Sequence, residues 1–327
     1  MRAAEMASRE ILPMSLTGIR LAQIRRGMLP AAFALLLTPF ALPQAASAEE
    51  VVKTYTVSGR AQVHVDTNDG SVRVVTSPSS RTVEFHVTYM GYELNKDLHV
   101  DSHQDGDRVE LTARLAGHWG WSWGHNSRSL KIEVRMPQSA DTQIETGDGS
   151  VETQALDGSL KVHTGDGSVR TASVTGNLDV DTGDGSITVD GAKGTIRLRT
   201  GDGHIEARGL DGTLEATSGD GHITIAGRFD GLTLKTGDGS IDAHALPGSK
   251  MRASWSVHTG DGSVDFALPA DLQADIDAST HDGHISMGIP VVCDGNFSKS
   301  QIHGKLNGGG QSLTITTGDG SIRLSKT

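Results

Sequence analysis

A six-residue motif recurs every 18 residues through the middle of this 327-residue chain. It reads Thr/Ser-Gly-Asp-Gly-Ser/His-Val/Ile, and less regular copies follow the regular block. The regularly spaced aspartates are Asp148, Asp166, Asp184, Asp202, Asp220 and Asp238, and the later ones are Asp261, Asp282 and Asp319. Self-similarity at a fixed period is the signature of a repeat architecture, so this spacing constrains the fold more than any other feature.

Each repeat contains two stretches in which apolar and polar residues alternate, as in Val169–Ala172 and Leu178–Thr182. Alternation with a period of two is typical of a strand, whereas a helix has a period of 3.6. A Gly-Asp-Gly turn precedes the first stretch, and a second glycine-bearing turn, Val174–Asn177, precedes the other. We therefore predict two short strands and two turns in every 18 residues.

Two all-β arrangements fit such a repeat. Asp-Gly between alternating runs is a hairpin signal, which permits an antiparallel meander. In a parallel β-solenoid, residue i lies beside residue i+18, and the outward positions then form rows of alternating charge, each pair worth roughly 0.2–1 kcal/mol. These rows are Lys161, Asp179, Arg197 and Glu215; His163, Asp181 and Arg199; and Glu152 with Arg170.

The inward positions also favour the solenoid. They form two apolar columns: Leu160, Leu178, Ile196, Leu214 and Leu232, and Val162, Val180, Leu198, Ala216 and Leu234. A meander would leave its apolar face uncovered, whereas a solenoid covers its own core. We predict an all-β parallel solenoid with about 18 residues and two strands per coil, in which a lone coil is unstable and stacked coils share their faces.

The chain divides into three predicted parts. Residues 1–48 are typical of an export signal, with a basic flank, a short apolar core at residues 29–37 and a small-x-small cleavage site at residues 46–48. Residues 49–140 are strand-rich without the 18-residue period, and we expect longer strands that begin and cap the stack. Residues 141–327 form the Gly-Asp-Gly repeat solenoid, and the insertions after Asp238 are expected to be loops at its corners.

Composition limits the partners. A formal charge of −11 argues against nucleic acid, and the predicted signal segment is itself basic, so the mature chain is more acidic still. One cysteine, Cys293, rules out an internal disulfide framework. No segment of the mature chain is apolar enough to span a membrane. We expect an exported protein that is periplasmic, on the cell surface or secreted, with a surface glycan or protein as its partner.

A tryptophan-rich segment interrupts the N-terminal part. Residues 117–125 read Gly-His-Trp-Gly-Trp-Ser-Trp-Gly-His, with three of the four tryptophans of the chain. One interpretation is a loop that covers the end of the core. The alternatives are a binding platform and an interfacial membrane contact. The platform would consist of Trp119, Trp121 and Trp123, flanked by His118 and His125.

Gly-Asp-Gly-Ser-Val/Ile coils behind a signal peptide resemble the bacterial putative-adhesin family of β-strand-repeat domains, a family of unknown function. The resemblance covers roughly residues 51–327 and rests on the repeat Gly-x-Leu/Ile-x-Val/Leu-x-Thr-Gly-Asp-Gly-Ser-Ile/Val. It implies a right-handed β-solenoid on exported or surface-associated proteins, and it supplies no catalytic residues. The tryptophan-rich segment is not part of the family pattern.

The aspartate column is the sharpest candidate for a site. Neighbouring carboxylates about 5 Å apart would repel by roughly 0.9 kcal/mol in water, so something should offset the repulsion. One expectation is that each aspartate accepts hydrogen bonds from backbone N–H groups of its turn. The alternative is bound Ca²⁺, as in β-rolls. His204 and His222, beside Asp202 and Asp220, are further candidate ligands for Zn²⁺ or Cu²⁺.

No set of residues indicates catalysis. Two carboxylates about 5 Å apart are typical of retaining glycosidases, but every pair in the column meets that criterion, so it selects none. The sequence favours a non-enzymatic solenoid that acts as a scaffold or adhesive surface and needs no cofactor. The alternatives are a Ca²⁺-binding module and a glycan-active β-helix enzyme.

Overall fold

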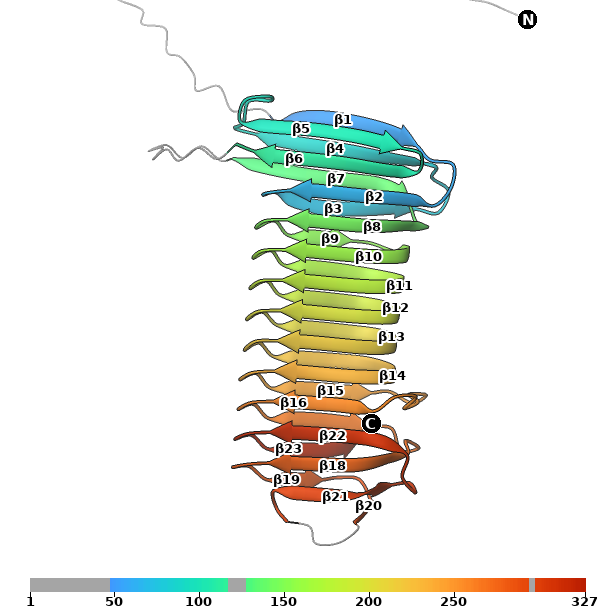
Figure 1. Ribbon diagram of the computed structural model, residues 1–327, viewed down its shortest axis with the longest axis vertical. Coiled ribbons are helices and arrows are strands. Elements are labelled where there is room, and N and C mark those ends of the chain that lie inside the picture. Colours follow the sequence, from blue (N-terminus) through green and yellow to red (C-terminus); the bar gives the residue numbers. More distant parts are fainter. Residues whose placement is uncertain (1–47, 117–127, 294–297) are drawn as a thin grey trace, which may run out of the picture. The chain divides into compact units, whose positions relative to one another are not determined.

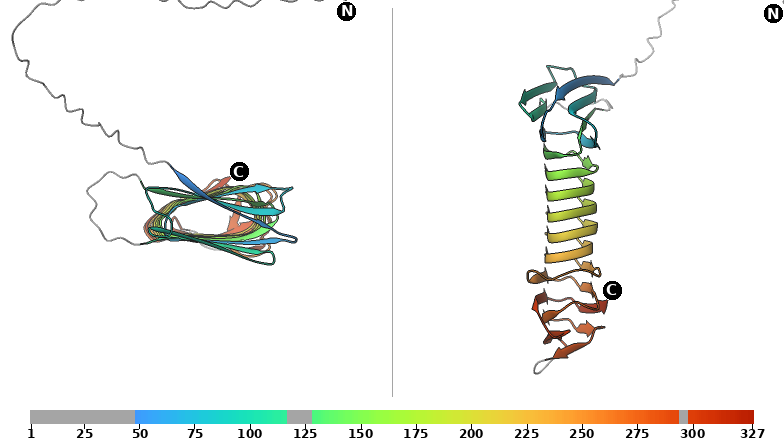
Figure 2. Two further views of the ribbon diagram at one scale, coloured as in Figure 1. Left: turned by 90° about the horizontal axis from the view of Figure 1, so that it is seen from above. Right: turned by 90° about the vertical axis from the view of Figure 1, so that its right-hand side faces the viewer.

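A computed structural model describes residues 48–116, 128–293 and 298–327, and these residues contain strands and no helix. The strands are hydrogen-bonded in one continuous 23-stranded sheet that winds along a single axis (Figure 1). Viewed along this axis, the coils enclose a flattened core between two faces (Figure 2). The described residues are thus all-β, as predicted.

The regular repeats form the middle of the stack. Each strand there is parallel to the next and pairs residue i with residue i+18, apart from shifts between β13 and β14. The strands are β10 (Leu156–Thr164), β11 (Val169–Thr182), β12 (Ile187–Thr200), β13 (Ile205–Ser218) and β14 (Ile223–Thr236). Lys161 pairs with Asp179, and Asp179 pairs with Arg197. The parallel solenoid is confirmed and the meander is excluded, while the right-handed sense stays a prediction.

One coil contributes to two faces. In β11, residues 174–182 lie in what we call the long face and residues 169–171 in the short face. The predicted second turn at Val174–Asn177 is wrong, because these residues keep their strand pairing to residues 156–159. The chain instead bends one residue earlier, at Ser173, where φ is 55°. The next coils have Gly191 and Gly209 at this corner, which suits a left-handed backbone.

The inward columns form the core, as predicted. Leu178 and Val180 of β11 are almost fully buried, and so are their counterparts one coil away in both directions. Each coil lies about 4.8 Å from the next, so each inward side chain packs against neighbours above and below. Burial of each such side chain contributes roughly 1.5–3 kcal/mol, but only in a stack of coils.

The Thr-Gly-Asp-Gly turn has a steric explanation. A Cβ atom on Gly185 would lie 2.1 Å from the carbonyl oxygen of Gly167 in the preceding coil, and one on Gly203 would meet Gly185 in the same way. Only glycine permits this approach of backbone to backbone. The threonine before the turn is buried, and the hydroxyl of Thr200 donates toward the carbonyls of Gly183 and Gly185 at 3.3 and 2.9 Å.

The N-terminal end of the stack departs from chain order. Coil β2–β3 (Ala61–Thr67 and Ser71–Ser77) lies between coil β8–β9 (Ala140–Thr146 and Val151–Thr153) and coil β6–β7 (Arg108–Leu115 and Ser129–Pro137). Beyond it, β5 (Leu98–Asp105) and β4 (Thr82–Met90) pair antiparallel to β6 and β7, and β1 (Glu49–Thr56) pairs with β4. These strands cap the stack, as predicted, but with 8 or 9 residues they are shorter than the 14-residue strands of the regular repeats, so the prediction of longer strands is wrong.

The C-terminal end also departs from chain order, which the sequence did not predict. β14 is followed in the stack by β15 (Ile241–Ala245) and β16 (Trp255–Thr259), and then by β17 (Val264–Leu268). The next coil is the last in sequence, β22–β23 (Gln311–Thr317 and Ile322–Lys326). Coil β18–β19 (Ala274–Thr280 and Ile285–Met287) lies outside it, followed by β21 (Gln301–Leu306) and β20 (Val291–Cys293), which are antiparallel. The chain end therefore lies inside the stack (Figure 1).

The buried threonine column supports a first prediction. Thr200→Val should destabilise the protein by about 1–3 kcal/mol, because the Gly203 N–H, which donates to the Thr200 hydroxyl at 3.2 Å, would lose its partner. Thr200→Ser should cost less, since Ser218 has the same role in the next coil. Chemical denaturation of the two variants measures the difference. An equal loss for both would contradict this role of the hydroxyl.

Candidate functional site

The predicted aspartate column exists as an exposed line of carboxylates along one edge of the stack. All six regularly spaced aspartates are exposed, and Oδ1 of Asp184 would lie 3.1 Å from a Cβ atom on Gly201 of the next coil. The expected hydrogen bonds from the turn are not formed: within the described ranges, these carboxylates accept none and make no ion pair. The turn is stabilised by its threonine and glycines, so its geometry does not depend on the aspartate.

His204 and His222 lie on adjacent coils, and their rings stack with centroids 5.4 Å apart and planes 11° apart. Nδ1 of His204 accepts the His222 N–H at 3.3 Å, and Nδ1 of His222 accepts the Ser240 N–H at 3.0 Å. Lone pairs in parallel ring planes do not converge on one ion. No group of three or more His, Cys, Asp or Glu side chains is placed to hold a metal in the part of the chain that the structure covers.

The predicted tryptophan platform of Trp119, Trp121 and Trp123, with His118 and His125, lies outside the described residues. The described residues on either side of this segment belong to the end of β6 and the start of β7. In the neighbouring coil, β2 and β3 are joined by an Asn-Asp-Gly turn. Asn68 in that turn holds Leu115 by two hydrogen bonds of 2.8 and 2.9 Å. The platform stays a prediction.

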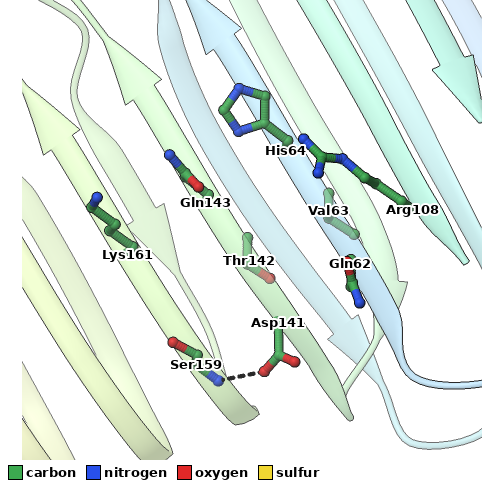
Figure 3. A pocket seen from close by; sticks show the side chains of 9 residues that line it. All are labelled: Gln62, Val63, His64, Arg108, Asp141, Thr142, Gln143, Ser159 and Lys161. Carbon is green, nitrogen blue, oxygen red and sulfur yellow. Dashed lines mark hydrogen bonds between the residues drawn. The ribbon is translucent and has the colours of Figure 1, made fainter.

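A polar groove lies on the long face where the N-terminal coils meet the regular repeats (Figure 3). It has a volume of about 370 Å³ and combines side chains from β6, β2, β8 and β10. Its polar lining residues are Gln62, His64, Arg108, Asp141, Thr142, Gln143, Ser159 and Lys161. The sequence did not reveal it, because most of these positions lie before the first regularly spaced Gly-Asp-Gly motif.

Hydrogen-bond donors outnumber acceptors in this groove. Its one carboxylate, Asp141, accepts the Ser159 N–H at 2.9 Å and pairs with Arg60 at 3.2 Å. Arg108 pairs with Glu110 at 2.5 Å. Lys161 has no ion pair or hydrogen bond with any described residue, although Asp179 is its neighbour in register. Lys161 and Arg108 stand on opposite sides of the groove, which is thus a cationic site on an acidic protein (Figure 3).

The predicted charge rows have the predicted register, but they form fewer bonds than expected. Arg197 Nε donates to Glu215 at 3.0 Å, and Arg199 reaches the same carboxylate at 3.3 Å. The hydrogen bond from Arg197 holds the pKa of Glu215 below its usual value, and Glu215 in turn raises the pKa of Arg197. His163 and Asp181 are 3.6 Å apart. The predicted rows of alternating charge are therefore short groups of two or three paired side chains and not continuous chains of ion pairs.

A second hollow, of about 560 Å³, lies at the C-terminal end of the stack. Its lining is mainly apolar and includes Ile285, Met287 and Val291. Ile285 and Met287 belong to the last coil of the short face, and among the described residues no further strand pairs with β19 on its outer side. The hollow is a consequence of the open end of the core. No helix in the described ranges has the length and apolar character needed to cross a membrane.

The lowered pKa of Glu215 predicts a pH effect. A carboxyl with a depressed pKa in the folded state stabilises that state above its unfolded pKa, about 4.5, and this contribution disappears as the pH falls through the folded pKa. Glu215→Gln should therefore cost a few tenths of a kcal/mol at pH 7, because the pair is partly exposed, and less at about pH 3. Urea denaturation at both pH values is the measurement. Asp148→Asn, whose carboxylate is exposed, should not show this loss.

The exposed aspartate column also predicts the response to calcium. In a Ca²⁺-stabilised roll, the ion is held by ligands from more than one turn, but the stretch between successive Gly-Asp-Gly turns here carries Thr175 and Lys193, which lie in paired strands. Removing Ca²⁺ with EDTA should leave the melting temperature unchanged, and adding it should have no effect beyond that of equal ionic strength. A rise of several degrees with Ca²⁺ but not with Mg²⁺ would instead support the calcium alternative.

Comparisons with known proteins place the chain in a family. It is similar to three solved structures. A putative adhesin from Parabacteroides merdae is 10% identical, and the match covers 85% of this chain and 97% of the other with a TM-score of 0.44. A putative lipid binding protein from Parabacteroides distasonis is 11% identical, with coverages of 85% and 97% and a TM-score of 0.42. A putative cell adhesion protein from Clostridium sporogenes is 12% identical, with coverages of 86% and 100% and a TM-score of 0.28. No curated protein matches the sequence. The Toastrack DUF4097 family profile matches residues 61–325, and the chain therefore belongs to the Toastrack DUF4097 family.

Proposed function

We propose that this protein is an exported, non-enzymatic scaffold that adheres to a surface glycan carrying carboxylate groups, and that the polar groove of the long face is its binding site. The observation that carries the proposal is the unpaired Lys161 in a groove rich in donors. A carboxylate on the ligand would pair with Lys161, and sugar hydroxyls would bond to the amides of Gln62 and Gln143.

The sheet supports binding by keeping the groove in one shape. The groove residues lie on four strands that are hydrogen-bonded side by side, and the strands are fixed by the buried core behind them. A ligand would therefore bind without ordering a loop, which lowers the entropic cost of association.

The groove chemistry favours binding over catalysis. Glycoside hydrolysis usually requires two carboxyl groups on either side of the scissile bond. Asp141 is the one carboxylate lining the groove, and it is already engaged by Arg60 and the Ser159 N–H. This arrangement supports a non-enzymatic role. Export rests on the predicted signal at residues 1–48, and fractionation of cells that express the tagged full chain tests it.

The binding test uses two lysines on the same face. Lys161→Glu should weaken binding to polygalacturonate about tenfold or more, because the substitution places a carboxylate against the carboxylates of the ligand. Lys235→Glu is the matched control, since Lys235 is exposed on the long face but four coils away from Lys161. The readout is biosensor binding of the mature chain to polygalacturonate and to neutral dextran.

Selective loss of polygalacturonate binding in Lys161→Glu, with binding retained in Lys235→Glu, supports the site. Equal loss in both variants would point to nonspecific charge attraction. If the wild-type chain binds dextran as strongly as polygalacturonate, the preference for carboxylates is wrong.

A further inference from the structure

The last coil in sequence lies between two coils that precede it in sequence. β22 pairs with β16 through five residue pairs on one edge and with β18 through seven on the other. On the short face, β23 pairs with β17 and with β19. After Leu268 the chain therefore passes the position of one coil, forms the outer strands, and then returns to fill the gap.

The outer strands depend on this returning coil. Among the described residues, β18 and β19 have no strand partner toward the centre of the stack except β22 and β23. β20 and β21 pair only with each other and with β18. Residues 274–306 are therefore held to the protein by a coil that follows them in sequence.

The connections on each side are short. Residues 269–273 join β17 to β18, and residues 307–310 join β21 to β22. In the second connection, Asn307, Gly308 and Gly309 have positive φ values of 48°, 91° and 85°. The Asn307 side chain donates to the carbonyls of Ala270 and Leu272, both at 2.8 Å, and so ties the two connections together.

The contacts that hold the returning coil are the same as those in the regular repeats. The Thr317 hydroxyl donates to the Gly262 carbonyl at 2.7 Å, and the Thr280 hydroxyl donates to the Gly320 carbonyl at 2.8 Å. Arg323 pairs with Asp265 at 3.0 Å, and the Thr327 N–H donates to Leu268 at 2.9 Å. The coil is thus an ordinary repeat. In the stack it lies nearer the centre than β18 to β21, although it follows these strands in sequence.

We propose that the C-terminal coil, residues 311–327, is a lock that holds this end of the stack. When it leaves its place, residues 274–306 detach together with it, and the edges of β16 and β17 become exposed to other strands. A parallel edge of this kind is a template for pairing, so the lock also protects the protein from association through that end. The attachment of β18 to β21 therefore depends on residues 311–327, which follow these strands in sequence.

Two glycine substitutions in the full chain separate this dependence from simple fraying. A Cβ atom on Gly320 would lie 2.1 Å from the Gly262 carbonyl, so Gly320→Ala should expel the C-terminal coil. A Cβ atom on Gly283 would lie 2.0 Å from the Gly320 carbonyl, so Gly283→Ala should disturb only the outer coil. Hydrogen exchange followed by mass spectrometry reports on each segment.

Gly320→Ala should speed exchange about tenfold or more in both 311–326 and 274–306, while residues 205–236 stay protected. Gly283→Ala should speed exchange in 274–306 but leave protected those amides of 311–317 that donate to β16, because β16 still pairs with β22. If residues 274–306 keep their protection in Gly320→Ala, the proposal is wrong. It is equally wrong if the two variants give the same pattern.

A disulfide supplies the converse test. Ser256 and Thr314 are neighbours in register and point outward on the long face, so Ser256→Cys with Thr314→Cys, in a Cys293→Ser background, should fix the coil in place. Oxidation should then slow exchange in 274–306, which the disulfide does not touch. Arg170→Cys with Thr188→Cys is the matched control in the middle of the stack. Slowing by both disulfides, or by neither, would overturn the lock.

Discussion

The close approach of backbone to backbone at the Gly-Asp-Gly turn is the constraint on which the rest of this structure depends. At Gly167, Gly185, Gly203 and Gly221, a side chain would meet the carbonyl of the preceding coil within about 2 Å, so no other residue fits. This contact sets the spacing of the coils at one edge, and the threonine hydroxyl secures it. A fixed spacing makes each inward residue meet the same column in the next coil, which builds the core.

This division of roles explains why the aspartate differs from its neighbours in the turn. In the regular repeats, the second glycine and the hydroxyl of the threonine or serine before the turn are required by contacts with the neighbouring coil, whereas the carboxylate is exposed and has no partner within the described ranges. Exposed like charges about 5 Å apart repel weakly in water and are screened by salt, so the column is tolerated at small cost. It gives the edge a strong negative charge, while the cationic groove lies on a face of the sheet. The two features would attract ligands of opposite sign.

The parts that could be predicted from the sequence are those set by neighbours 18 residues apart. The pairing of Lys161 with Asp179 and the burial of Leu178 and Val180 follow from the period alone. The bend at Ser173 was misplaced, because a glycine at position 176 suggested a turn where the strand in fact continues. The groove could not be predicted, since it brings Arg108 beside coils that lie before and after it in sequence. The position of residues 311–327 in the stack could not be predicted either. All coils have nearly the same repeat sequence, so the sequence of one coil does not specify which other coils it packs against.

The same rearrangement at both ends has a common physical cause. In a stack that follows chain order, the first and last coils each have one neighbour, and their free edges fray. Here coil β2–β3 has β8–β9 on one side and β6–β7 on the other, and coil β22–β23 is also paired on both sides. The outermost strands are antiparallel to their neighbours, β1 and β5 at one end and β20 and β21 at the other, and they do not continue the parallel pattern. Strands from the interior of the sequence thus form the cap at one end and most of the cap at the other, where β1 also lies, and coils β2–β3 and β22–β23 gain the two-sided packing that makes a repeat stable.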